Sequence, residues 1–116
     1  MSDLFSVSGE RAGDGLGVVT LSGEVDIYTA PQFKQCMLEL LDGGVDRMIV
    51  DLSGVTFIDS TALGVLIGGV RRVNSAGGAM ALIVTSRAVA RVLSITGLDH
   101  VFTIHATREA AVESLA

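Results

Sequence analysis

Short apolar segments alternate with segments of helical periodicity along most of the chain, and this alternation restricts the possible fold more than any other feature. Two apolar segments, residues 4–7 and 18–21, come first and are separated by a loop that carries Gly13-Asp14-Gly15. Glycine and aspartate adopt the positive φ angles of tight turns, so these segments predict an antiparallel β-hairpin. Helical and strand-like segments then follow in turn, which is typical of parallel strands joined by helical crossovers.

The first predicted helix has a clear start. Thr29 precedes it and, with Gln32 three residues later, matches a capping box. Pro31 falls in the first turn, where its missing N–H costs nothing. The apolar side chains that follow repeat at helical spacing and share one face: Phe33, Cys36, Met37, Leu40 and Leu41. Gly43-Gly44 ends the helix.

The remaining segments complete an α/β pattern. Residues 47–52 (RMIVDL) form a nearly continuous apolar run, as expected for a strand that is covered on both faces. We expect a helix at residues 61–74, a strand at 80–85, a helix through 96 capped by Ser86, a strand at 101–104 and a last helix to 115 capped by Thr107. The prediction is one α/β domain over residues 1–116, whose mixed β-sheet has an N-terminal antiparallel hairpin followed by alternating helices and strands.

Composition excludes several classes of protein. Hydrophobic residues make up 49% of the chain and charged residues 18%, which argues against disorder. A formal charge of −5 leaves no basic surface for nucleic acid. One cysteine, Cys36, cannot form an internal disulfide, which suits a reducing cytoplasm. The most apolar stretch, residues 62–70, is about half the length that spans a bilayer, and nothing at the start resembles a signal peptide. We therefore expect a cytoplasmic protein without a membrane segment.

Polar residues gather where the predicted strands end, which is where functional groups collect in open α/β sheets. Residues 23–26 follow the second strand, and residues 51–60 follow the third and lead into the second helix. Asp59, Ser60 and Thr61 stand at the start of that helix, and each is able to cap it. A phosphorylated serine is the alternative, because a phosphate there would face free N–H groups and the positive end of the helix dipole. Spacing alone does not decide between these two roles.

Four short motifs resemble one family. Asp59-Ser60-Thr61-Ala62-Leu63-Gly64 resembles the D-S-[ST]-G-L-G signature of the bacterial anti-sigma-factor antagonists (anti-anti-sigma factors) of the STAS family. LSGEVD at residues 21–26, with Thr29-Ala30 after it, is similar to the family's G-E-[LIV]-D-x-x-[TS]-A segment. IVDL at 49–52 leading into VTF at 55–57, and ITGL at 95–98, also fit, so the resemblance covers almost the whole chain. The one departure is Ala62, where the family usually has glycine.

The resemblance implies a partner-switching regulator with the STAS fold. The unphosphorylated protein would bind an anti-sigma factor that is also a serine kinase with a histidine-kinase-like ATPase fold, and so release the sigma factor. The kinase would then phosphorylate Ser60 and the complex would dissociate, until a metal-dependent PPM-type phosphatase removed the phosphate. The resemblance also implies a partner-binding surface made of Asp26, Asp59, Ser60, Thr61, Ala62 and Gly64.

Other functions have weaker support. Asp51, at the end of an apolar run, could be the phosphoacceptor of a receiver-like domain, but no acidic pair follows the first strand to hold Mg²⁺. A STAS subunit of a stress-sensing or lipid-transport complex is a further alternative. We predict no enzyme, cofactor or metal site, because the sequence has no cofactor motif and no third ligand stands near His100 and His105. A monomer or a weak dimer is expected.

Gly64 and Gly68 are four residues apart and share one face of the second predicted helix. Two explanations stay open for this pair of glycines. Either they pack closely against a neighbouring backbone within the domain, or they leave a smooth surface that the backbone of a partner can approach.

Overall fold

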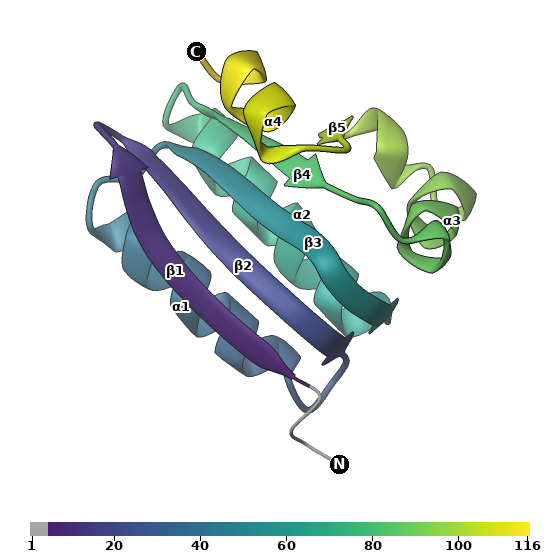
Figure 1. Ribbon diagram of the computed structural model, residues 1–116. Helices are drawn as coiled ribbons and strands as arrows, with labels where there is room; N and C mark the ends of the chain where they lie inside the picture. Colours follow the sequence, from purple (N-terminus) through teal and green to yellow (C-terminus); the bar gives the residue numbers. More distant parts are fainter. Residues whose placement is uncertain (1–4) are drawn as a thin grey trace.

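The computed structural model describes residues 5–116, which fold into five strands, four α-helices and a short 3-10 helix (Figure 1). The strands are β1 (Ser6–Gly13), β2 (Leu16–Val25), β3 (Arg47–Ile58), β4 (Ala79–Ile83) and β5 (Thr103–His105). The helices are α1 (Ala30–Asp42), α2 (Ser60–Ser75), α3 (Arg87–Ile95), η2 (Leu98–His100) and α4 (Arg108–Ser114).

The strands form one sheet in the order β1-β2-β3-β4-β5. β1 and β2 pair antiparallel, and each later strand runs parallel to its neighbour. The predicted mixed sheet is thus confirmed. Residue 4, at the start of the first predicted strand, lies outside the described residues, and β1 runs on to Gly13. Gly15 takes a φ of 72° in the turn, as the hairpin prediction requires.

Helices cover both faces of the sheet, but not equally. α1 and α2 lie side by side on one face, α4 lies on the other face over β4 and β5, and α3 lies beyond the end of β4 (Figure 1). The larger part of the core fills the space between the sheet and α1, α2 and α3, and the smaller part lies under α4. β3 supplies Met48 and Val50 to the larger part and Ile49 to the smaller, which confirms a strand covered on both faces.

The apolar stripe of α1 faces the core, as predicted, but it is not buried evenly. Phe33 and Met37 are almost completely buried, and burying a side chain of this size stabilises the fold by about 1.5–3 kcal/mol. Cys36, Leu40 and Leu41 pack against the core from its margin and are only partly buried. The helix phase is therefore correct, and the centre of the stripe carries most of its stabilisation.

The prediction of a capping box at the start of α1 is wrong. Thr29 precedes the helix, but its side chain makes no cap hydrogen bond, and its φ and ψ of −102° and −20° are already helical. Its hydroxyl donates instead to the carbonyl oxygen of Glu24 and accepts from the amide of Asp26, each at 2.9 Å. The predicted caps at Ser86 and Thr107 are confirmed, since their side chains accept from backbone amides three residues later.

β3 is longer than the sequence predicts, and residues 53–58 form strand rather than loop. β4 ends at Ile83, opposite Asp51, while β3 continues beside β2 as far as Ile58. Buried Val55 and Ile58 hold this extension against the core, and the β2–β3 register shifts at two points along the paired strands. Asp51 therefore lies within a strand, where its carboxylate accepts from the backbone amide and hydroxyl of Ser53. This placement argues against the receiver-like alternative.

Among residues 5–116, no helix has both the length and the apolar character needed to cross a bilayer.

Candidate functional site

Ser60 is the first residue of α2, one position earlier than the predicted start of the helix. Its side chain is exposed, as is that of Thr61. Within residues 5–116 neither hydroxyl has a hydrogen-bond partner. The site lies at the carboxyl ends of β2 and β3, where the amide of Asp59 donates to the carbonyl oxygen of Val25, the last residue of β2, at 3.2 Å.

Asp59 caps α2 and also links the helix to the neighbouring loop. Its Oδ1 accepts from the amide of Ala62 at 3.0 Å, which is the N-cap bond. Its Oδ2 accepts from the amide of Ile27 at 3.0 Å. Hydrogen bonds to an ionised acceptor are stronger than those between neutral groups, so one carboxylate fixes two segments to each other. The capping role that three residues could have filled therefore belongs to Asp59.

Asp26 organises the β2–α1 loop from within. Its Oδ1 accepts from the amides of Tyr28 and Thr29 at 2.9 and 3.1 Å, the pattern of an Asx turn. Its carbonyl oxygen accepts from the amides of Thr29 and Ala30, where α1 begins. The segments that carry Asp26 and Asp59 lie side by side, as the strand order predicts. Both carboxylates accept hydrogen bonds from the backbone.

The other predicted site residues differ in how a partner could reach them. Gly64 is exposed on the first turns of α2, near Thr61. Ala62 is 0% exposed and packs in the core. Its place in the predicted partner-binding surface is therefore wrong, because residue 62 of this helix faces the sheet. The side chain that departs from the family signature therefore points into the core and not to the surface.

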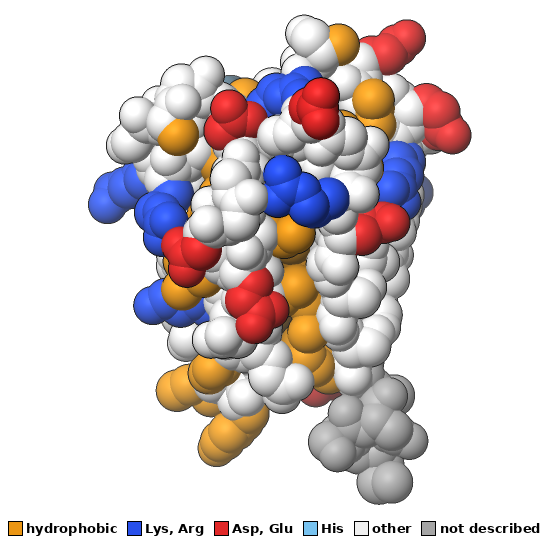
Figure 2. Space-filling view, turned by 90° about the vertical axis from the view of Figure 1, so that its left-hand side faces the viewer, with side chains coloured by type: hydrophobic (Ala, Val, Ile, Leu, Met, Phe, Trp, Pro, Cys, Tyr) orange, Lys and Arg blue, Asp and Glu red, His pale blue; other side chains and the backbone are white. Residues whose placement is uncertain are grey.

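Sequence reasoning missed three exposed apolar side chains close to Ser60. Ile27 and Tyr28 in the β2–α1 loop are 59% and 84% exposed, and Phe57 near the end of β3 is 49% exposed. Figure 2 shows apolar side chains protruding at the lower end of the molecule, which is where Figure 1 places the carboxyl ends of β2 and β3. The signal was present as two apolar residues between the end of a strand and a helix start, where polar residues are the norm.

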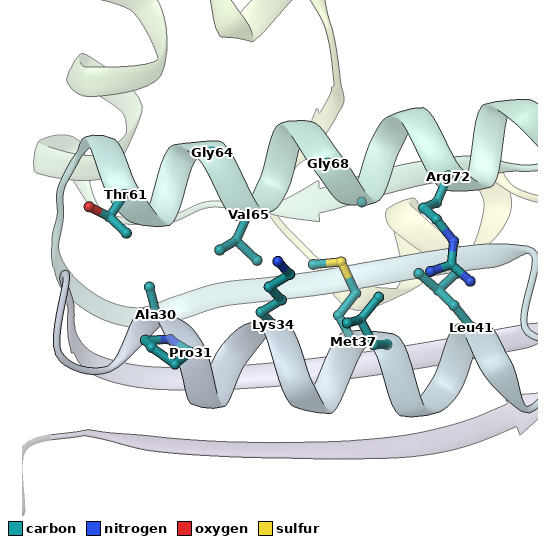
Figure 3. Close-up of a pocket in the computed structure, with 12 residues that line it drawn as sticks. Ala30, Pro31, Lys34, Met37, Leu41, Thr61, Gly64, Val65, Gly68 and Arg72 are labelled. Atoms are coloured by element: carbon teal, nitrogen blue, oxygen red, sulfur yellow. The ribbon is translucent and has the colours of Figure 1, made fainter.

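A groove of about 740 Å³ runs between α1 and α2 and begins beside Thr61 (Figure 3). We call it the α1–α2 groove. Most of its lining is apolar, and its charged members are Lys34 and Arg72. The residues that line it are Ala30, Pro31, Lys34, Met37, Leu38, Leu41, Thr61, Gly64, Val65, Gly68, Gly69 and Arg72.

Nothing in the described part of the chain points to redox or metal chemistry at this site. Burial, and secondly the nearby charge of Glu39, raises the pKa of the Cys36 thiol, which keeps it protonated at neutral pH. Residues 5–116 contain no group of three His, Cys, Asp or Glu side chains that could hold a metal ion. The site itself presents two exposed hydroxyls, exposed apolar side chains and a groove.

The STAS domain family model matches residues 11–111 of the chain. The chain belongs to the STAS domain family. This match begins near the end of β1 and spans β2, the Ser60 segment and the remaining strands, so the resemblance seen in the four motifs is confirmed.

Anti-sigma factor antagonists recur among the most similar STAS proteins. The chain is 36% identical over 95 residues to the anti-sigma-B factor antagonist of Bacillus subtilis, covering 82% of this chain and 86% of that relative. An anti-sigma factor antagonist from Mycobacterium paratuberculosis has a crystal structure that matches with a TM-score of 0.88 at 28% identity, over 99% of this chain and 97% of that one. Unphosphorylated SpoIIAA, also an anti-sigma factor antagonist, matches with a TM-score of 0.82 at 23% identity, over 94% and 95% of the two chains, which shows the shared fold.

Proposed function

We propose that this protein is a cytoplasmic anti-sigma factor antagonist, and that phosphorylation of Ser60 releases it from its anti-sigma factor. The observation that supports this most is the placement of Ser60. It is an exposed hydroxyl at the start of α2, and the neighbouring Asp59 already supplies the helix cap. Ser60 is therefore not needed as the helix cap. It directly follows the aspartate of the motif that resembles the antagonist signature. The relatives named above are anti-sigma factor antagonists, which supports the first part of this proposal.

The local structure is able to accept a phosphate at Ser60 without unfolding. The first turn of a helix leaves N–H groups unpaired, and the positive end of its dipole favours a nearby anion. A phosphoserine adds about −1.5 to −2 charges and three strong acceptor oxygens at neutral pH. The helix start compensates part of this charge within the domain. A partner that contacts Ser60 has no such compensation. The phosphate therefore weakens the free energy of binding more than it lowers the stability of the domain.

The surroundings of Ser60 suit a protein partner. Ile27, Tyr28 and Phe57 expose apolar area, and aromatic side chains are enriched at the centres of protein interfaces. Asp26 and Asp59 place two carboxylates in the segments next to the hydroxyl. The partner surface would therefore complement a hydroxyl, apolar side chains and negative charge. An added phosphate would lie among groups that are already anionic.

The chemistry of the switch is phosphoryl transfer supplied by the partners. In the forward step, Ser60 Oγ bonds to the γ-phosphorus of ATP, the bond to the β-phosphate oxygen breaks, ADP leaves and the hydroxyl proton passes to a base of the kinase. A serine kinase with a histidine-kinase-like ATPase fold would catalyse this step. In the reverse step a PPM-type phosphatase would use water to release inorganic phosphate. The antagonist itself contributes only the hydroxyl and its exposure.

The test is phosphorylation by the cognate kinase. We would purify each histidine-kinase-like anti-sigma factor encoded by the host and incubate it with ATP and the antagonist. One of them should add one phosphate to the wild-type protein and to Thr61→Ala, and none to Ser60→Ala. Thr61 is a matched control because it is an exposed hydroxyl one position further along the same helix. Phosphate that maps to Thr61, or no phosphorylation by any of these kinases, would contradict the proposal.

A further inference from the structure

We infer that the α1–α2 groove is a second contact site for the same anti-sigma factor, and that it accepts an amphipathic helix whose polar side carries acidic residues. This inference rests on the function proposed above. Four features of the groove support it: its shape, its glycines, its charge and its continuity with Ser60.

The shape of the groove fits a helix. Its lining runs from Ala30 to Leu41 along α1 and from Thr61 to Arg72 along α2. At a rise of about 1.5 Å per residue, each side extends about 16 Å, or three helical turns. Apolar side chains such as Met37 and Val65 line the space between the two helices (Figure 3). A helix of three to four turns could lie in it and bury its apolar face.

Two of the glycines in α2 have no role inside the domain. A Cβ atom at Gly64 or Gly68 would meet nothing within 4 Å among the described residues. Gly69 differs, because a Cβ there would run into the side chain of Met37. Glycine destabilises a helix interior relative to alanine, so the two open positions weaken α2 without any gain in packing. Their close packing on a neighbouring backbone, one of the two explanations left open by the sequence, is therefore wrong. What remains is the approach of a backbone from outside.

The charge of the groove selects an anionic occupant. Its charged lining residues are both cations, although the whole chain has a formal charge of −5. Figure 3 shows the side chains of Lys34 and Arg72 turned toward the space between the two helices. Arg72 pairs with Asp42 at 3.2 Å, where both side chains are largely exposed. Lys34 has no ion pair within residues 5–116. An occupant with acidic side chains would supply the missing partner.

The groove is continuous with the proposed switch. Thr61 lines one end of the groove and directly follows Ser60 in α2. A helix that lies along Gly64 and Gly68 would therefore reach Ser60 with one end. A phosphate on Ser60 would then face an acidic helix as well as the surface around it. This arrangement explains how one modification could break contacts beyond its own side chain.

The test compares groove variants with matched controls in calorimetric titrations of the cognate anti-sigma factor identified by the kinase assay. Gly68→Leu fills the groove, and Lys34→Glu reverses its unpaired charge. Each should raise the dissociation constant at least tenfold. Asn74→Leu places the same bulk at an exposed position of α2 outside the groove, and Arg108→Glu makes the same charge change on α4. Both controls should bind within twofold of wild type, and all four variants should keep the wild-type circular dichroism spectrum.

The outcomes separate this inference from the proposed function. Wild-type affinity in Gly68→Leu and Lys34→Glu, with weakened binding in Ser60→Glu, would overturn the groove contact and leave the switch intact. Weakened binding in the groove variants, and its recovery for Lys34→Glu when a single acidic residue of the partner is changed to lysine, would support it. A fatty acid also combines an apolar body with a negative charge, as the proposed helix does, so dodecanoate is used as a probe for this alternative ligand. If dodecanoate changes the NMR chemical shifts of the Val65 and Met37 methyl groups, and Gly68→Leu and Lys34→Glu bind the anti-sigma factor with wild-type affinity, the groove binds a lipid anion instead.

Discussion

Replacing Asp59 by alanine removes a carboxylate that accepts backbone hydrogen bonds from two separate segments. The bond from Ala62 is an N-cap, and losing an N-cap costs about 0.5–2 kcal/mol. The bond from Ile27 ties down the β2–α1 loop, and a hydrogen bond to a charged group contributes about 1.5–3 kcal/mol. Because both bonds lie near the surface, the lower ends of these ranges apply. We expect the free energy of unfolding to fall by about 2 kcal/mol in total.

Asp59→Asn is the matched control for this change. Its amide oxygen can keep the bond from Ala62, but its amide nitrogen cannot accept the bond from Ile27. We expect a loss of about 1.5 kcal/mol, because only the bond from Ile27 is removed. Urea unfolding measures the stability of both variants, and amide hydrogen exchange at Ile27 reports on the loop. A loss below about 0.5 kcal/mol in Asp59→Ala, with unchanged exchange at Ile27, would refute the reasoning.

Three further experiments test the packing of the domain. Met37→Ala should lower the free energy of unfolding in urea melts by about 2–5 kcal/mol, whereas the partly buried Leu40→Ala should lose only about 1–2 kcal/mol; equal losses would contradict the burial pattern. Gly69→Ala should be less stable than Gly64→Ala by about 1 kcal/mol or more, because its Cβ would meet the ends of the Met37 and Met80 side chains, which must shift. Gly64→Ala should be neutral or stabilise by up to about 1 kcal/mol, since its Cβ would meet nothing within 4 Å among the described residues; thermal melts that rank the two variants in the opposite order would refute this. Cys36 should react with a thiol reagent at pH 7 more slowly than free cysteine and accelerate as the pH rises, because burial raises its pKa; a faster reaction than free cysteine would be inconsistent with that.

The order of the elements was predictable because it depends on local pattern. Each helix repeats its apolar residues at a period close to 3.6, and each buried strand is a short apolar run between turn residues. The 3-10 helix Leu98–His100 was missed, since three residues are too few to show a period. The last strand was placed two residues early for the same reason. Local periodicity thus gives the succession of elements and leaves short ones uncertain.

Caps were predictable only where nothing competes for the capping side chain. Ser86 and Thr107 have extended backbones and accept from the first turn of the helix that follows. Thr29 has the same chemistry, but its hydroxyl hydrogen-bonds to Glu24 in β2 and to Asp26 in the loop that follows. The Gln32 amide donates to the carbonyl oxygen of Thr29 instead. A capping motif therefore predicts a helix start more reliably than it predicts the bond itself.

The features that distinguish this site depend on contacts between distant parts of the chain. The extension of β3 past Ser53-Gly54, which resembles a turn in sequence, depends on pairing with β2. The bridge from Asp59 to Ile27 spans 32 residues. The α1–α2 groove depends on how two helices sit on the sheet. Sequence motifs therefore located Ser60, whereas the surface around it became visible only in three dimensions.

The division of labour between Asp59 and Ser60 leads to a prediction about affinity. Since Asp59 provides the cap, Ser60→Ala should change the free energy of unfolding by less than about 0.5 kcal/mol and should still bind the anti-sigma factor. Ser60→Glu should remain folded, because a carboxylate in the first turn of a helix is favourable. Crowding a central interface position commonly costs about 2 kcal/mol, or roughly thirtyfold in dissociation constant. We therefore expect Ser60→Glu to bind at least tenfold more weakly than Ser60→Ala in calorimetric titrations. Equal affinities of the two folded variants would mean that Ser60 is only an exposed serine at the start of a helix.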